Sequence, residues 1–194
     1  MRKSEMERGT KETKIYLSLN LDEQEEARID TGIGFFDHML NLFASHGRFG
    51  IDLSAEGDYE VDNHHVIEDA GIVLGKAFKE ALGDKRGIRR YASKFTPMDE
   101  SLSRVCIDIS GRGMLVFDSC FTCERIGSME TEMIEEFFRA FAVSSGITLH
   151  IAMMYGKNNH HMAESMFKGF GRALKEAVSI DKLIEGIPST KGVL

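Results

Sequence analysis

The sequence predicts an α+β fold made of two internally duplicated half-domains, each a mixed β-sheet with helices packed on one face. The first observation is that stretches of alternating polarity mix with stretches of helical periodicity, without strict strand–helix alternation. The second is that residues 68–82 align without gaps on residues 164–178, with Lys-Glu-Ala in both copies. Two copies indicate two half-domains rather than a solenoid. We expect the first half-domain over residues 1–95 and the second, with a C-terminal phosphate-binding tail, over residues 96–194.

The elements of the first half follow from its patterning. Residues 1–13 are charged and mostly polar, so we expect them to fray. Residues 14–20 alternate in polarity and predict a strand, and residues 27–31 predict a short strand that returns beside it as a hairpin. The other expected elements are a helix over residues 35–45, a strand over residues 50–61 and a helix from residue 64 to about residue 83.

The second half repeats this plan. Residues 87–96 are strand-like and basic, and residues 97–100 predict a turn. The expected elements after that turn are strands over residues 101–110 and 114–122, a helix over residues 131–144, a strand over residues 147–155 and a helix that ends near residue 178.

The composition limits the class of protein. With 194 residues, 42% hydrophobic and 28% charged, the chain fits one or two compact domains. Its net charge of −7 argues against a nucleic-acid or anionic-membrane partner, although local basic residues can bind a small anionic substrate. The sequence shows neither a signal-peptide pattern nor an apolar run of membrane length, so we expect a soluble, cytoplasmic protein. Three cysteines, including Cys120-x-x-Cys123, are expected to be buried or free thiols.

A duplicated motif, His-His-x-x-Glu, contains four of the seven histidines. A helix turns about 100° per residue, so neighbouring histidines point in different directions, whereas the Glu shares a face with either. We infer that each motif serves two metal ions and that the copies face each other across a pseudo-two-fold axis, within one chain or between chains. The alternative is a pair of amphipathic helices with polar first turns. The two copies are His64, His65 and Glu68, and His160, His161 and Glu164.

Further histidines and one glutamate are candidate ligands. His38 lies on the helix before the first motif, and Glu136 takes the matching position before the second. Glu136 is either a ligand or an exposed helix carboxylate. His150 is expected to be a core or sheet-face residue, and His46 is expected to bind substrate or to cap its helix. Imidazoles and carboxylates without thiolates favour manganese, iron or zinc, and manganese suits such a site when it keeps open positions.

Basic and hydroxyl side chains offer anion-binding groups. Arg presents a planar fork for phosphate and Lys a point charge. Lys168 lies one turn after Glu164, and the tail adds hydroxyls and a cation. A solvated basic surface is the alternative for each of them taken singly. The candidates are Arg90, Arg112, Lys168, Ser189 and Lys191.

Together these motifs resemble the imidazoleglycerol-phosphate dehydratase family. The resemblance covers Glu12 to the C-terminus, and we expect the monofunctional form, which has no fused phosphatase domain. It is carried by residues 31–40, 62–69, 98–102, 107–112, 159–164 and 188–192.

The resemblance implies a homo-oligomer of 24 subunits with two Mn²⁺ ions per active site at subunit interfaces. One ion would be held by His38, His65, Glu68 and His160. The other would be held by His64, His161, Glu164 and the residue at position 136. Much of the family has His at position 136. In this chain either Glu136 binds the second ion, or water or His150 takes that ligand position. Substrate contacts would fall on Glu12, His46, Arg90, Arg112, Lys168, Ser189 and Lys191.

The implied activity is that of a metal-dependent hydro-lyase of L-histidine biosynthesis. It would dehydrate D-erythro-imidazoleglycerol phosphate to imidazole-acetol phosphate, through a substrate imidazolate held between the two manganese ions. The imidazolate would expel the hydroxyl, and a carboxylate or histidine would take the carbon proton. Glu164, Glu12 and His46 are the candidates for the acid–base roles.

Three alternatives stay open at this point. A di-iron bundle protein would carry Glu-x-x-His on long helices, which is the reverse order and conflicts with the many strands. A non-catalytic metal-binding module would not turn over the substrate. A dinuclear phosphoesterase would release inorganic phosphate.

Overall fold

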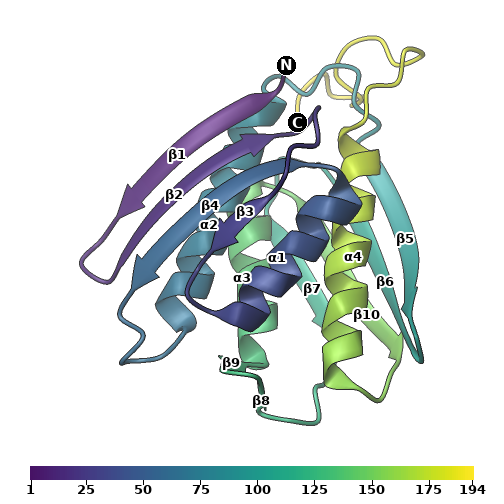
Figure 1. Ribbon diagram of the computed structural model, residues 1–194. Coiled ribbons are helices and arrows are strands. Elements are labelled where there is room, and N and C mark those ends of the chain that lie inside the picture. The colour runs from purple at the N-terminus through teal and green to yellow at the C-terminus, as the bar shows by residue number, and fades with distance from the viewer.

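The computed structural model describes residues 1–194 and contains two four-stranded sheets with four helices between them (Figure 1). The first sheet has, in spatial order, β1 (Lys3–Gly9), β2 (Thr13–Asn20), β4 (Gly50–Gly57) and β3 (Arg28–Asp30). The second has β5 (Tyr91–Met98), β6 (Ser101–Asp108), β10 (Thr148–Tyr155) and β7 (Met114–Asp118). The helices are α1 (Gly34–Gly47), α2 (His64–Leu82), α3 (Glu132–Ser145) and α4 (Asn159–Val178). A small hairpin, β8 (Arg125–Ile126) and β9 (Met129–Glu130), precedes α3.

The two halves share one topology, which confirms the predicted α+β fold of duplicated half-domains. In each sheet the second strand pairs antiparallel with the first and with the strand between the two helices. The third strand pairs parallel with that same strand. Helices α2 and α4 pack against one face of the first and second sheet, respectively. β5 begins at Tyr91, so it spans the boundary expected between residues 95 and 96.

Two expectations for the N-terminal region were wrong. Residues 3–9 do not fray but form β1, an edge strand that pairs with β2 along its whole length. Its outward positions are charged and Met6 is its one large apolar side chain, so main-chain pairing rather than apolar alternation defines the strand. β3 does not return as a hairpin beside β2 but pairs parallel with β4, because β1 and β4 already flank β2.

Close helix packing brings α1 against α4 and α2 against α3. At Gly171 of α4, a Cβ atom would lie 2.5 Å from the Phe43 carbonyl oxygen of α1. At the equivalent Gly75 of α2, it would lie 2.7 Å from the Phe141 carbonyl oxygen of α3. Only a residue without a side chain permits such an approach. Buried phenylalanine rings fill the space around both contacts, for example the stacked pair of Phe43 and Phe170.

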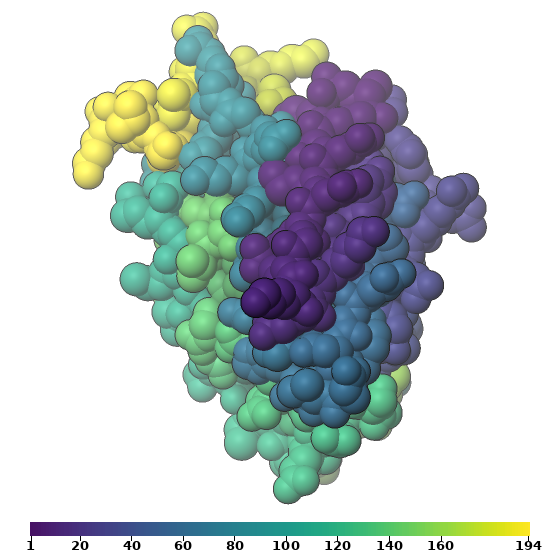
Figure 2. Space-filling model, turned by 90° about the vertical axis from the view of Figure 1, so that its left-hand side faces the viewer, coloured from purple at the N-terminus to yellow at the C-terminus, as the bar shows by residue number.

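The two ends of the molecule differ in content. Both termini lie at one end (Figure 1), where the C-terminal tail projects from the surface (Figure 2). The first turn of α4 and the β8–β9 hairpin lie at the opposite end (Figure 1). None of the helices combines the length and apolar content needed to cross a bilayer.

Candidate active site

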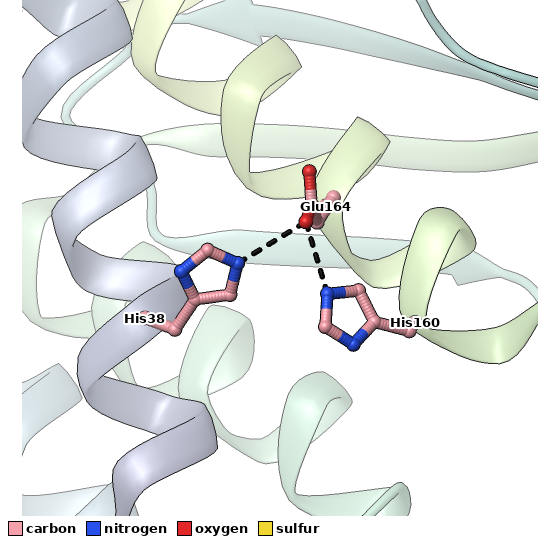
Figure 3. Close-up of side chains that lie close together, drawn as sticks. All are labelled: His38, His160 and Glu164. Carbon is pink, nitrogen blue, oxygen red and sulfur yellow. Dashed lines mark hydrogen bonds and ion pairs between the residues drawn. The ribbon is translucent and has the colours of Figure 1, made fainter.

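Three potential ligand side chains converge between α1 and α4. His38 projects from α1, and His160 and Glu164 lie one turn apart on α4, so that all three point toward one another (Figure 3). Glu164 Oε1 lies 3.1 Å from His38 Nε2 and 2.9 Å from His160 Nε2. One ligand atom of each residue lies within 4.8 Å of the other two. Two imidazoles and a carboxylate in this arrangement are suitable donors for a divalent cation.

The charge state of Glu164 follows from its surroundings. Burial would raise its pKa, but hydrogen bonds from Lys168, His38 and His160 outweigh burial and lower the pKa to about 2. Lys168 Nζ donates a hydrogen bond to Oε2, so both carboxylate oxygens have partners. His46 lies two turns beyond His38 on α1, where partial desolvation and then the charge of Lys168 lower its pKa and favour the neutral imidazole. The site is therefore an ionised carboxylate among nitrogen donors.

Adjacent histidines in each motif diverge, as the helical geometry predicts. The His160 and His161 ring centroids are 6.3 Å apart with an interplanar angle of 86°. The rings of His64 and His65 are 6.2 Å apart at 76°. The Asn158 side chain accepts hydrogen bonds from the backbone N–H groups of His160 and His161, which fixes the first turn of α4.

His161 points away from the three-residue cluster toward the turn between β5 and β6. Its Nδ1 lies 2.8 Å from Glu100 Oε2, and its Nε2 lies 3.9 Å from Asp99 Oδ2. The hydrogen bond to Glu100 raises the pKa of His161 and lowers that of Glu100. The sequence analysis assigned no role to Glu100. Its one signal was position, since it precedes β6 as Glu12 precedes β2.

The first motif forms separate pairs. His64 Nε2 lies 3.9 Å from Glu68 Oε2. His65 Nδ1 lies 3.1 Å from both carboxylate oxygens of Asp58, and its Nε2 lies 3.9 Å from Glu12 Oε2. The hydrogen bond to Asp58, a second residue that the sequence analysis missed, raises the pKa of His65. Within this chain the first motif does not join the three-residue cluster, and Glu164 lies with the two histidines that the resemblance gives to the other ion.

Topology relates Glu136 to His38. Each is the fifth residue of a 14-residue helix, α3 and α1 respectively, and these helices are equivalent in the two halves. The Glu136 carboxylate lies 3.5 Å from Arg139 Nε and is 25% exposed. His150 is exposed on β10 opposite Cys106, and its neighbours Leu149 and Ile151 are the buried ones. His150 therefore faces away from the helices that carry the donors.

Four of the five candidate anion binders line one cavity of about 580 Å³ at the C-terminal end of the molecule. Arg90 is held there by Asp108, through an Nε–Oδ1 distance of 2.7 Å, and by the Pro188 carbonyl oxygen. The Arg90 backbone N–H also bonds Ala177, near the end of α4. The fifth candidate, Lys168, lies with Glu164 instead. The four residues of this anion groove are Arg90, Arg112, Ser189 and Lys191.

Comparison with known proteins places the chain in a family. The family model of imidazoleglycerol-phosphate dehydratase matches residues 31–174. The chain belongs to the imidazoleglycerol-phosphate dehydratase family. A curated relative of that name from Acetivibrio thermocellus is 58% identical over 193 residues, covering 100% of this chain and 99% of the relative. Another from Lactiplantibacillus plantarum is 56% identical over 194 residues, with full coverage of both chains.

Solved structures of family members have the same architecture. The imidazoleglycerol-phosphate dehydratase of Staphylococcus aureus superposes with a TM-score of 0.85 at 40% identity, over 92% of this chain and 99% of that one. The enzyme of Pyrococcus furiosus, solved in complex with (S)-C348, superposes with a TM-score of 0.84 at 33% identity, over 97% of this chain and all of that one. The family that the sequence motifs resemble is thereby confirmed.

All three cysteines are unpaired, in agreement with the expected free thiols.

Proposed function

We propose that this protein dehydrates D-erythro-imidazoleglycerol phosphate to imidazole-acetol phosphate in L-histidine biosynthesis. The observation that carries the proposal is the convergence of His38, His160 and Glu164 in a chain of this family. The curated relatives that bear the name of this dehydratase align with this chain along their full length. A dehydratase needs groups that bind the substrate imidazole, hold the phosphate and move a proton, and the chain offers candidates for each.

The donor set fits two Mn²⁺ ions. The three-residue cluster supplies three of the ligands that a six-coordinate ion takes, which leaves positions for other residues and for substrate. The pseudo-symmetry of the halves supports a second set built from α2 and α3, in which Glu136 takes the place of His38. When bound, the ions would supply Lewis acidity that favours loss of a proton from the substrate imidazole. The residues that we propose as ligands are His38, His64, His65, Glu68, Glu136, His160, His161 and Glu164.

Two carboxylates have different proton-transfer capacity. Glu164 is ionised and has both oxygens engaged by Lys168 and histidines, so it suits a ligand better than a proton carrier. The Glu12 carboxylate is 56% exposed, and its only nearby charged partner is His65 Nε2, at 3.9 Å. We assign Glu12 to removing the carbon proton as the carbon–oxygen bond breaks. The neutral imidazole of His46 is a second candidate for this role.

The distance between the metal ligands and the anion groove supports an active site shared between subunits. The Arg90 N–H bonds Ala177, which follows His160 by about 25 Å along α4 at ~1.5 Å per residue. A three-carbon phosphate ester with one imidazole ring is much shorter than that. We infer that a substrate molecule bound at the three-residue cluster of one chain takes its phosphate contacts from the anion groove of another. A closed homo-oligomer meets this requirement, and we propose the 24-mer that the family resemblance implies.

Turnover with product identification tests the proposal. Metal-free protein is supplied with Mn²⁺ and imidazoleglycerol phosphate, and the products are resolved by chromatography and NMR. The expected product is imidazole-acetol phosphate, with activity lost on chelation and regained with Mn²⁺. Release of inorganic phosphate would instead identify a phosphoesterase, and binding without turnover a metal-binding module.

A further inference from the structure

The duplication places one carboxylate at equivalent turns of the two halves. Glu12 is the last residue before β2, and Glu100 is the last residue before β6. Each lies beside the second histidine of a His-His motif, His65 and His161 respectively. Their contacts differ. Glu12 approaches the Nε2 side of its histidine at 3.9 Å, whereas Glu100 bonds the Nδ1 side of its own at 2.8 Å.

Glu100 is fixed by contacts on both oxygens. Its Oε1 accepts hydrogen bonds from the backbone N–H groups of Asn158 at 2.8 Å and Lys157 at 3.2 Å. Its Oε2 is left for His161 Nδ1. An ionised carboxylate only accepts hydrogen bonds, so Nδ1 of His161 must carry the proton. The Nε2 lone pair of the neutral ring is then directed away from Glu100 and is available to a cation.

In the first half another residue makes the Nδ1 contact. Asp58 follows β4 directly and holds His65 Nδ1 with both oxygens at 3.1 Å. The residue that follows β10 in the second half is Gly156, where a Cβ atom would lie 2.6 Å from Ser101 Oγ and 2.7 Å from Met162 Cγ. That position cannot hold an aspartate without repacking. The second half therefore depends on the turn carboxylate for this contact.

We propose that Asp58 and Glu100 are positioning residues that hold His65 and His161 with Nδ1 protonated and Nε2 free for a metal ion. Asp58 thereby releases Glu12, the counterpart of Glu100, for work on the substrate. The inference rests on the proposed function, because it takes both histidines as metal ligands. Carboxylates behind metal-binding histidines commonly fix the tautomer in this way, and their loss weakens metal binding by about 10- to 100-fold.

Because their hydrogen bonds differ, Glu100→Gln and Asp58→Asn should affect the tautomer of their histidines differently. In Glu100→Gln the amide oxygen must stay on the Lys157 and Asn158 N–H groups, which turns the NH₂ group toward His161 Nδ1. That group donates, so it forces the proton onto Nε2, the atom that should bind metal. In Asp58→Asn the side chain has no other partner among the hydrogen bonds, so it can keep its oxygen on His65 Nδ1.

Manganese titration of the purified full chain tests this. Free Mn²⁺ is followed by electron paramagnetic resonance, and the melting temperature of the metal-free protein is measured in parallel. We expect Glu100→Gln to lower the affinity for one of the two ions about 10- to 100-fold and to leave the melting temperature of the metal-free protein unchanged. Asp58→Ala should weaken binding similarly through His65, and Asp58→Asn much less. Glu80→Gln, the same substitution at an exposed site on α2, should keep wild-type Mn²⁺ affinity.

The outcomes separate this inference from the proposed function. Wild-type affinity for both ions in Glu100→Gln would overturn the positioning role. A fall in melting temperature that accompanies the loss of metal would also overturn it, because Glu100 would then act on the fold. If wild-type protein itself bound no Mn²⁺ or failed to dehydrate the substrate, the proposed function would fail first.

Discussion

Complementation between two variants of low activity tests whether the active site spans subunits. His160→Ala removes a ligand from the three-residue cluster but leaves the anion groove intact. Arg112→Ala removes a guanidinium from the groove but leaves the cluster intact. Arg112 is exposed and its side chain makes only a 3.4 Å contact to the Ser110 carbonyl oxygen, so the fold should tolerate its loss.

The expected magnitudes follow from the loss of one charged contact and from the statistics of mixing two chains. Loss of one hydrogen-bonded charge should cost Arg112→Ala about 1.5–3 kcal/mol, or about 10- to 100-fold in kcat/KM. His160→Ala should be less active still. In a random mixture of the two chains, a site that takes its cluster from one chain and its groove from another is intact in up to about a quarter of cases.

The assay uses co-expressed, differently tagged chains that are purified through both tags. The value of kcat/KM is measured at substrate concentrations well below the KM. A control mixes wild-type chains with chains that carry both substitutions. A shared site predicts up to about a quarter of wild-type activity in both mixtures. A site within one chain predicts about half in the control and no more than the residual activity of the two variants in the complementing mixture. That second pattern would refute the reasoning.

Three further predictions concern metal, packing and pH. Glu136→Gln should weaken Mn²⁺ binding about 10-fold or more while Glu136→His retains it, because imidazole and carboxylate are interchangeable donors there; calorimetry measures both. Gly171→Ala should lower the free energy of unfolding by about 1–3 kcal/mol through overpacking, whereas Gly34→Ala, with open space around its Cβ, should not; denaturant titration of metal-free protein decides. His65 and His161 have raised pKa values in the metal-free protein. Metal binding must displace their protons, so Mn²⁺ affinity should fall as pH falls through those raised values, and a pH-independent affinity would contradict this.

Much of the fold was predictable because its signals are local. The helices that begin at His64 and near His160 have apolar periodicity over about five turns and repeat each other in sequence. β1 was not predictable, because an edge strand with charged outward positions is defined by its partner rather than by its own pattern. The pairing of β3 with β4 was missed for the same reason, since nothing in residues 28–30 encodes which strand lies beside them.

The candidate site was predictable where a residue type reveals its own chemistry. His38, His160 and Glu164 stand out as donors in the sequence, and the helix period relates the last two. Asp58 and Glu100 do not stand out, because a carboxylate in a turn is ordinarily solvated. Only the fold brings Glu100 beside His161, 61 residues later in the chain.

A crystal structure of the Mn²⁺-loaded protein, with anomalous scattering recorded at the manganese edge, tests the central claim most directly. Two anomalous peaks are predicted in each active site, one of them bound by His38 Nε2, His160 Nε2 or the Glu164 carboxylate. The His161 ring should present Nε2 to an ion and keep Nδ1 on Glu100. If these side chains kept only their mutual hydrogen bonds at saturating Mn²⁺, with no peak beside them, the account would be contradicted.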